Sequence, residues 1–474
     1  MALSAERALY ASYVALLLWL PIPLGSNRPW AIAVLEIGSF VLAACWLALW
    51  ANRGAPAGAV IARAWPAHLL MAGWLAYSAL HLVPLPAGLI ELLSPAAARA
   101  QRLTEALGHA PRFMTLSIDP HASQRALLAS LAYVAIFYLA LALFNSRARV
   151  LFAVRCIVYA AVAHAVYGIL MHVGNVEGEF FGTFIKHGDS AKGTFVNRNH
   201  FAGYLEMTLA MGVGLLLVGI SDRSAGSWKR FAVGLLDWVL SPRMVLRLSL
   251  CVLVIALTTT HSRMGNAAFF AALLVAGVIG ITMSRRAARN TVVVLASLVA
   301  IDVFIVGSWF GVEKLARRLE ETALVDIQGR EEPAAHALAI VRDFPLFGAG
   351  PGSFYAAFQA YRPESITAFF DHAHNDYVQF AAESGLVGFA LLALFVLASL
   401  GMALRAQWQR GDPLMRGISF ACIMGVTSIL IHSWVDFNLQ IPANAAYFMV
   451  LLALGWISLH HGRQPRPQGG EPGR

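Results

Sequence analysis

Uninterrupted apolar stretches of about 20 residues recur along the whole chain, and they limit its possible folds more than any other feature. The hydrocarbon core of a bilayer, about 30 Å thick, accommodates each stretch as one helix. Backbone N–H and C=O groups cannot stay unpaired in lipid, so only helices and closed barrels span a membrane. The sequence therefore predicts a bundle of membrane-spanning helices.

Composition agrees with an all-α integral membrane protein. Of the 474 residues, 58% are hydrophobic and 13% are charged, against roughly 25% charged in an average soluble domain. We expect one polytopic domain, residues 1–474, in place of the several soluble domains that the length alone would suggest. Twelve spans are expected, at about 8–25, 30–51, 66–83, 125–145, 150–172, 200–221, 244–260, 266–284, 291–309, 376–404, 417–436 and 441–460.

Cysteine placement gives no sign of a structural cross-link or a metal. All four cysteines lie inside the apolar runs and are interpreted as small core residues, so neither a disulfide framework nor a zinc site is predicted. They are Cys45, Cys156, Cys251 and Cys422.

Basic residues recur in alternate connections between the expected spans, and those connections hold almost no acid. Cytoplasmic loops are enriched in Lys and Arg, so this pattern predicts cytoplasmic N- and C-termini. The net charge of +9 is then mostly a topology signal, and no nucleic-acid partner is expected. The residues concerned are Arg53, Arg63, Arg147, Arg149, Arg223, Lys229, Arg230, Arg243, Arg285, Arg286, Arg289, Arg405, Arg410, Arg416, Arg463, Arg466 and Arg474.

The segments on the opposite side are longer or more polar than simple connectors. They are 84–124, 173–199, the short turn 261–265 and a large loop at 310–375. Within the large loop, helices are expected at 312–322 and 330–344, with Pro333 in a first helical turn and Leu338, Ile340 and Val341 on one face. The glycines at 348, 350 and 352 are interpreted as a flexible turn. By its location, 84–124 would shape the entrance for an acceptor.

A dense polar cluster, Asp371-His372-Ala373-His374-Asn375-Asp376, ends the large loop where an apolar run begins. Ionisable groups are scarce in this chain, and at a membrane boundary they mark functional sites. Histidine is the natural general base near neutral pH. The His and Asp side chains are also metal-ligand types, so a zinc or manganese site is a competing interpretation.

Cations on the same expected face suggest a phosphate ligand. Lys192, Arg198, Arg263 and Arg330 all lie in the outward segments, and Arg198 and Arg263 directly precede apolar runs. The guanidinium fork binds phosphate oxygens in pairs. Each arginine could instead reach lipid headgroups or pair with a loop acid such as Glu320.

Four segments in order resemble the O-antigen ligase and polymerase superfamily. These are Lys192-Gly-Thr-Phe-Val-Asn-Arg-Asn-His-Phe-Ala-Gly-Tyr-Leu205, then Thr260-His-Ser-Arg-Met-Gly265, then Gly329-Arg330 with Phe344-Pro-Leu-Phe-Gly-Ala-Gly350, and finally His374-Asn375-x9-Gly385-x-x-Gly388. The Met before Gly265 departs from the family's Ser-Arg-Gly turn. The resemblance extends over about 150–440.

The resemblance implies a metal-independent GT-C glycosyltransferase of the bacterial inner membrane, working on the periplasmic face without a cofactor. It would transfer a glycan from undecaprenyl pyrophosphate to lipid A-core. His374 would be the base or position the acceptor, Arg263 and Arg330 would clamp the pyrophosphate, and Arg198 and Lys192 would support them. Asn375 or Asp376 would orient His374 or the sugar. Asn197 and Asn199 would hold the loop backbone or bind sugar.

Other activities remain open on these motifs. An O-antigen polymerase, or an oligosaccharyltransferase acting on protein Ser or Thr, would share them. A lipid or glycan transporter is a further alternative, although transporters usually carry ionisable groups near the middle of the membrane.

Overall fold

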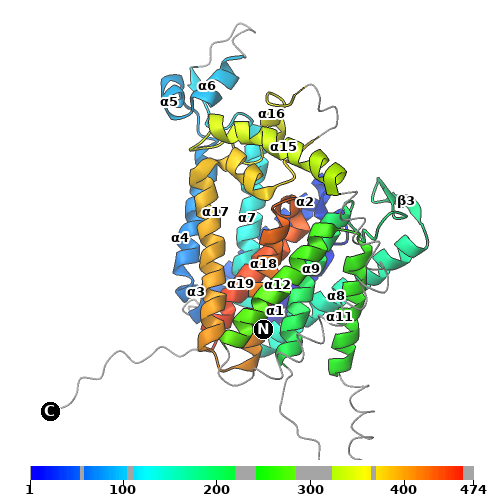
Figure 1. Ribbon diagram of the computed structural model, residues 1–474. Coiled ribbons are helices and arrows are strands. Elements are labelled where there is room, and N and C mark those ends of the chain that lie inside the picture. Colours follow the sequence, from blue (N-terminus) through cyan, green and yellow to red (C-terminus); the bar gives the residue numbers. More distant parts are fainter. Residues whose placement is uncertain are drawn as a thin grey trace, which may run out of the picture.

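The chain folds as a helical bundle with a helical cap over one end (Figure 1). The computed structural model describes residues 2–53, 58–103, 112–218, 242–283, 323–363 and 370–462. The helices are α1 Ala2–Trp19, η1 Leu24–Ser26, α2 Pro29–Arg53, α3 Ala59–Arg63, α4 Trp65–Leu80, α5 Ala87–Leu93, α6 Pro95–Arg102, α7 Pro120–Leu143, α8 Arg147–Val173, α9 Arg198–Val218, α11 Pro242–Thr259, α12 Arg263–Thr282, α15 Ala323–Asp343, α16 Phe354–Phe358, α17 Asp376–Gln409, α18 Pro413–His432, η3 Asn438–Gln440 and α19 Pro442–His460.

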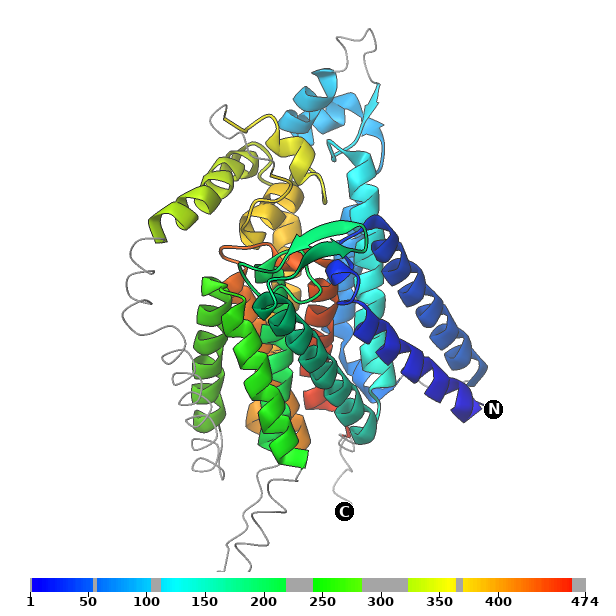
Figure 2. The same cartoon turned by 90° about the vertical axis from the view of Figure 1, so that its right-hand side faces the viewer.

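Strands are few in the described part of the chain. The pair β1 (Leu85–Pro86) and β2 (Phe113–Met114) is antiparallel, as is the hairpin of β3 (Glu177–Phe180) and β4 (Thr183–Lys186). The hairpin lies across the end of the bundle in the turned view (Figure 2).

The expected all-α membrane fold is confirmed. Eight described helices are long and apolar enough to cross a membrane. Every expected span coincides with a helix except 291–309, which lies outside the described residues. The central helices are α9, α18 and α19; most residues of their apolar windows are buried inside the protein, 94% for α19 against 11% for the peripheral α2.

Small residues bring α9 and α18 into backbone contact. A Cβ atom on Gly214 would overlap the Gly417 carbonyl, and one on Gly417 would overlap the Gly214 carbonyl. Small residues at helix interfaces allow this close approach in membrane proteins. The contact places polar side chains of the two helices within hydrogen-bonding distance of each other.

Helix α17 is broken at Gly385, which has φ 59° and ψ −176°. The backbone groups freed by the break pair with the preceding loop: Gly350 N–H donates to the Glu383 carbonyl at 2.8 Å, and Leu386 N–H donates to the Pro345 carbonyl at 2.8 Å. A Cβ atom on Gly385 would overlap the Leu346 carbonyl. Only glycine allows both this conformation and this approach. The break fixes the first turns of α17 against the cap.

The cap consists of α5, α6, α15 and α16 (Figure 1). It has its own apolar cluster, in which residues of 84–124 pack against residues of the large loop. Ile90, Met114, Ile340 and Phe358 are buried in it together with Ala373, the neighbour of His374. Residues of the segment 84–124 therefore share one apolar cluster with the neighbour of His374. The role of this segment at an acceptor entrance stays a prediction.

Three details of the large loop differ from expectation. Helix α15 begins before Gly329, so Pro333 lies inside the helix and not in its first turn. Leu338 is 44% exposed and does not share the buried face of Ile340. The glycine turn is closely packed, because a Cβ on Gly350 would overlap Ser117. The expected helix at 312–322 lies outside the described residues.

The end of the bundle opposite the cap is basic. Arg147 pairs with Asp412, Arg149 Nη1 lies 2.6 Å from Glu6 Oε1, and Arg410 donates to the His461 carbonyl at 2.7 Å. The three arginines belong to the set of basic residues that the sequence analysis predicts on the cytoplasmic side.

Candidate active site

The polar cluster is fixed to the rest of the bundle by Asn375, the N-cap residue of α17. Its Oδ1 accepts from Val378 N–H at 3.1 Å, which satisfies a donor that the first helical turn leaves unpaired. Its Nδ2 donates to the Trp434 carbonyl at 2.7 Å. One side chain therefore starts α17 and joins it to the connection between α18 and α19.

Asp376 also joins the start of α17 to the α18–α19 connection, and it does so through several hydrogen bonds. Its side chain is buried and accepts from Ser433 Oγ at 2.8 Å and from Leu439 N–H at 3.1 Å. Its own N–H donates to the Ser433 carbonyl at 2.9 Å. The carboxylate is occupied in holding the α18–α19 connection, next to the polar cluster. This arrangement suits a supporting residue.

The side chains of the competing metal interpretation do not converge. Asp376 faces the α18–α19 connection, whereas Asp371 is exposed at the start of the cluster. Across the described ranges, no group of three or more His, Cys, Asp or Glu side chains is arranged to hold a metal ion.

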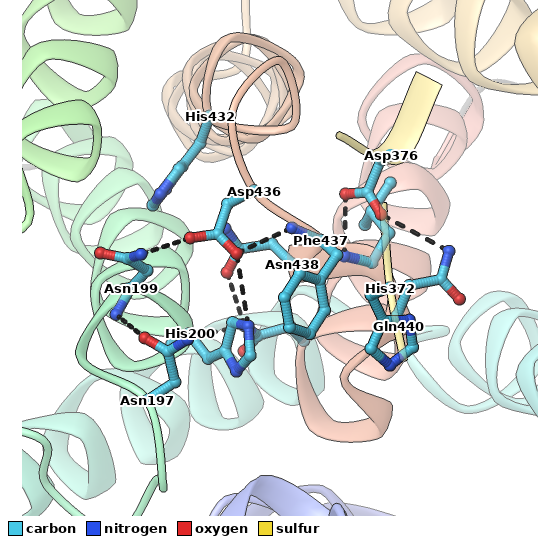
Figure 3. A network of polar contacts seen from close by, with 12 residues as sticks. Asn197, Asn199, His200, His372, Asp376, His432, Asp436, Phe437, Asn438 and Gln440 are labelled. Atoms are coloured by element: carbon cyan, nitrogen blue, oxygen red, sulfur yellow. Dashed lines mark hydrogen bonds and ion pairs between the residues drawn. The ribbon is translucent and has the colours of Figure 1, made fainter. Parts of the chain in front are cut away.

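Asp436, in the α18–α19 connection, is the centre of a buried network (Figure 3). It accepts a hydrogen bond from Asn199 Nδ2, and its Oδ1 accepts from Phe437 N–H at 2.8 Å. His200 Nε2 lies 3.4 Å from the same carboxylate. Burial alone would raise the pKa of Asp436, but its close contact with His200 and the charges of His200 and His432 hold that pKa well below its ordinary value.

Three imidazole rings surround Phe437. The ring centroid of His372 lies 4.3 Å from that of Phe437 in a stacked arrangement. His374 and His200 approach edge-on, with centroid distances of 4.8 and 4.6 Å. The aromatic ring thus fixes the positions of three histidines that come from α9 and from the polar cluster.

His374 itself has a backbone φ of 51°, in the left-handed region. A non-glycine residue rarely adopts this conformation, and such residues gather at functional sites. The residue is partly exposed, its Nδ1 is buried, and its ring centroid lies 5.7 Å from that of Phe370. The turn therefore presents His374 at the surface of the site while Asn375 and Asp376 are buried behind it.

A second buried network lies deeper between α9 and α18. Glu206 is fully buried, and it accepts from Ser428 Oγ at 2.6 Å and from His432 Nδ1 at 2.7 Å. The charges of Asp436 and Asp376 both act on His432. Figure 3 shows the His432 ring beside Asn199 and Asp436.

Two of the predicted cations stand at the starts of neighbouring helices. Arg198 begins α9 and the exposed Arg263 begins α12. The first turns of these helices are in contact, because a Cβ on Gly265 would lie 2.7 Å from Ala202 Cβ. Ser262 caps α12 by accepting from Gly265 N–H at 3.2 Å. The helix N-termini add positive potential beside both guanidinium groups.

Lys192 lies next to this pair. Its ammonium donates to the Lys186 carbonyl at 2.6 Å. Burial lowers the pKa of Lys192; the Asp189 charge opposes this shift and the Arg198 charge adds to it, so Lys192 and Arg198 share one neighbourhood. The side chain of Arg330 lies outside the described residues, although its backbone belongs to α15.

The two predicted asparagines before α9 have different environments. Asn197 Oδ1 accepts from Asn199 N–H at 2.9 Å and so caps the helix. Asn199 is buried and bonds to Asp436. The first therefore holds loop backbone, and the second joins α9 to the network.

Sequence reasoning missed Asp436, His200, Glu206 and the importance of His432. A signal existed for Glu206, because an ionisable residue inside a membrane-spanning run marks functional or structural polar contacts. Asp436 is the last residue of the expected span 417–436 and had the same signal.

The comparisons with known proteins add one match. Residues 248–393 match the family model described as O-antigen ligase. No curated protein matches the chain. The matched region contains Arg263, Arg330 and the polar cluster, whereas Asn199 and Asp436 lie outside it. The match supports a glycosyltransferase-type enzyme with an O-antigen ligase or polymerase type of function in lipopolysaccharide biosynthesis. The match confirms the resemblance to the O-antigen ligase superfamily that is seen in the sequence.

Proposed function

We propose that this protein is an O-antigen ligase of the bacterial inner membrane. It transfers a glycan from undecaprenyl pyrophosphate to a hydroxyl group of lipid A-core on the periplasmic face. The capped end of the bundle is then periplasmic, and the basic end with Arg147 and Arg410 is cytoplasmic, in agreement with the positive-inside rule.

In the proposed reaction, the acceptor oxygen attacks the anomeric carbon of the donor. His374 takes the hydroxyl proton, and the bond from the anomeric carbon to the pyrophosphate oxygen breaks. Undecaprenyl pyrophosphate leaves with the bonding electron pair. A sugar hydroxyl is a weak nucleophile, so removal of its proton in the transition state contributes typically 10²- to 10⁴-fold. The reaction needs no nucleotide, because the pyrophosphate is the leaving group.

Negative charge grows on the leaving pyrophosphate. Arg198 and Arg263 begin two contacting helices at the capped end, and Lys192 neighbours Arg198. We assign these cations, with Arg330, to the pyrophosphate. Fixed cations and helix N-termini aimed at developing charge stabilise the transition state.

The observation that carries the proposal is the placement of His374. It lies in the family-matched region and contacts Phe437, whose backbone N–H bonds to the Asp436 carboxylate that Asn199 joins to α9. The Phe437 ring, Asp436 and Asn199 therefore connect the proposed base to the helix that starts with a proposed pyrophosphate ligand.

The same arrangement would serve an O-antigen polymerase or a protein oligosaccharyltransferase, so the acceptor must be tested directly. Purified protein in detergent is mixed with an undecaprenyl-pyrophosphate glycan and either lipid A-core, no second acceptor, or a Ser-rich protein acceptor. EDTA is present throughout. We expect glycan joined only to lipid A-core. Lengthening of the donor glycan would instead show a polymerase. In a separate sample with the protein reconstituted into vesicles, movement of lipid between leaflets without transfer would show a transporter.

A further inference from the structure

His372 has a precisely oriented ring that the proposed reaction does not yet use. It stacks on Phe437 at 4.3 Å, on the ring that also contacts His374. Its side chain is 24% exposed. Within the part of the chain that the structure describes, the nearest acid to its Nε2 is Asp371, at 3.9 Å, which is beyond hydrogen-bonding distance.

The amide of Gln379 is held in one orientation. Its Oε1 accepts from Ala373 N–H at 3.1 Å, and a backbone N–H can only donate. Its Nε2 donates to Glu383 Oε1 at 3.1 Å. Glu383 is fixed in turn, because its Oε2 accepts from Gly352 N–H at 2.9 Å.

This orientation determines which imidazole nitrogen of His372 carries the proton. The second N–H of Gln379 Nε2 faces His372 Nδ1 at 3.0 Å, closer than the 3.3 Å from that nitrogen to Gln379 Oε1. Nδ1 therefore accepts, and in a neutral ring the proton is on Nε2. The Nε2–H group points away from the Gln379–Glu383 pair.

Charge around the ring is consistent with a neutral imidazole. Burial lowers the pKa of His372, and the nearby His200 adds to this shift; Asp371, whose side chain is exposed, and the hydrogen bond with Gln379 oppose it. Asp436 also acts to raise that pKa, but it is already paired with Asn199 and His200.

We propose that His372 donates its Nε2–H to an oxygen of the bound substrate, with the tautomer set by the Glu383–Gln379 pair, and that His374 alone is the base. The proposal rests on the proposed function. His372 thus becomes a catalytic residue that stabilises charge on oxygen, and Gln379 and Glu383 become positioning residues.

The test compares His372→Gln with His372→Ala in the transfer assay. A glutamine amide places an N–H near the position of histidine Nε2 but cannot act as a base near neutral pH. We expect His372→Gln to keep kcat within about tenfold of wild type, and His372→Ala to lose about 10²- to 10³-fold, the usual effect of removing one such donor. The acidic limb of the pH–kcat profile should persist in His372→Gln. His461→Gln, at the end of the bundle opposite the cap, is the matched control.

Gln379→Met gives an independent check, since it removes the amide and preserves side-chain length. We expect a fall in kcat similar to that of His372→Ala, with thermal unfolding measured in parallel. Equal loss in His372→Gln and His372→Ala, loss of the acidic limb in His372→Gln, or wild-type kcat in His372→Ala would each overturn the proposal. If wild type transfers no glycan, the proposed function fails, which is a different result.

Discussion

The imidazole ring of His374 stands nearly perpendicular to the ring of Phe437, with the two centroids 4.8 Å apart. The geometry of the proposed base therefore depends on an apolar side chain from another part of the sequence. The backbone N–H of Phe437 is itself fixed by Asp436 at 2.8 Å. Small displacements of a catalytic group reduce rate strongly, so both residues should affect catalysis without touching substrate.

Phe437→Leu should lower kcat about 10- to 100-fold, because it removes the ring that fixes His374 while leaving the backbone bond to Asp436. Initial rates of glycan transfer at saturating donor measure this. Phe184→Leu, at an exposed position of the β3–β4 hairpin, should stay near wild type. Equal rates in both variants would show that the ring contact has no catalytic role.

Asp436→Asn should lower the melting temperature in detergent by several degrees at pH 7. The folded-state pKa of Asp436 is below its ordinary value, which is about 4. Its ionised form therefore stabilises the protein at every pH above about 4, and this contribution disappears as the pH falls through the lowered folded-state value. Scanning fluorimetry should show a constant difference from wild type between pH 5 and 8. A difference that grows with acidity in that interval would contradict the assignment.

Gly385→Ala should severely destabilise the protein or prevent its folding, because the added Cβ overlaps the Leu346 carbonyl and the backbone φ is positive. The matched control is Gly401→Ala on the same helix, where nothing lies within 4 Å of an added Cβ. The control should be neutral or slightly stabilising, since alanine exceeds glycine in helix propensity by about 1 kcal/mol. Similar melting temperatures for the two variants would contradict the close approach of the Leu346 carbonyl to Gly385.

Arg263→Ala should raise KM for the lipid-pyrophosphate donor or lower kcat, with a combined loss in kcat/KM of about 10- to 100-fold. That range corresponds to a charged hydrogen bond of about 1.5–3 kcal/mol. Titration of the donor separates the two parameters, and KM for lipid A-core should change little. Arg125→Ala, exposed near the start of α7, is the control. An Arg263 variant with unchanged donor kinetics would remove this residue from the pyrophosphate site.

The sequence was sufficient for the helical bundle, because each long apolar run has one stable form in lipid. It was not sufficient for the break at Gly385. A single glycine in an apolar run is compatible with a continuous helix, and the opposing carbonyl of Leu346 comes from a loop nearly 40 residues earlier.

The polar networks show the same limit. Asn199 and Asp436 are 237 residues apart in the chain, and Glu206 and His432 are 226 apart. Each residue alone indicates only that a polar group is buried; its partner follows from the close packing of α9 on α18. His374 could be predicted because the motif is local, whereas Phe437, an ordinary apolar residue, had no such signal.

The central claim is that His374 is the base. Its most direct test is the kcat of His374→Ala for transfer to lipid A-core, at saturating donor and with EDTA present. His461→Ala, at the end of the bundle opposite the cap, serves as control, and equal melting temperatures verify that the variants are folded. We predict that His374→Ala loses at least about 100-fold in kcat while the control is unchanged. A folded His374→Ala variant whose kcat stays within threefold of wild type would contradict the account. Threefold corresponds to roughly 0.7 kcal/mol in activation free energy.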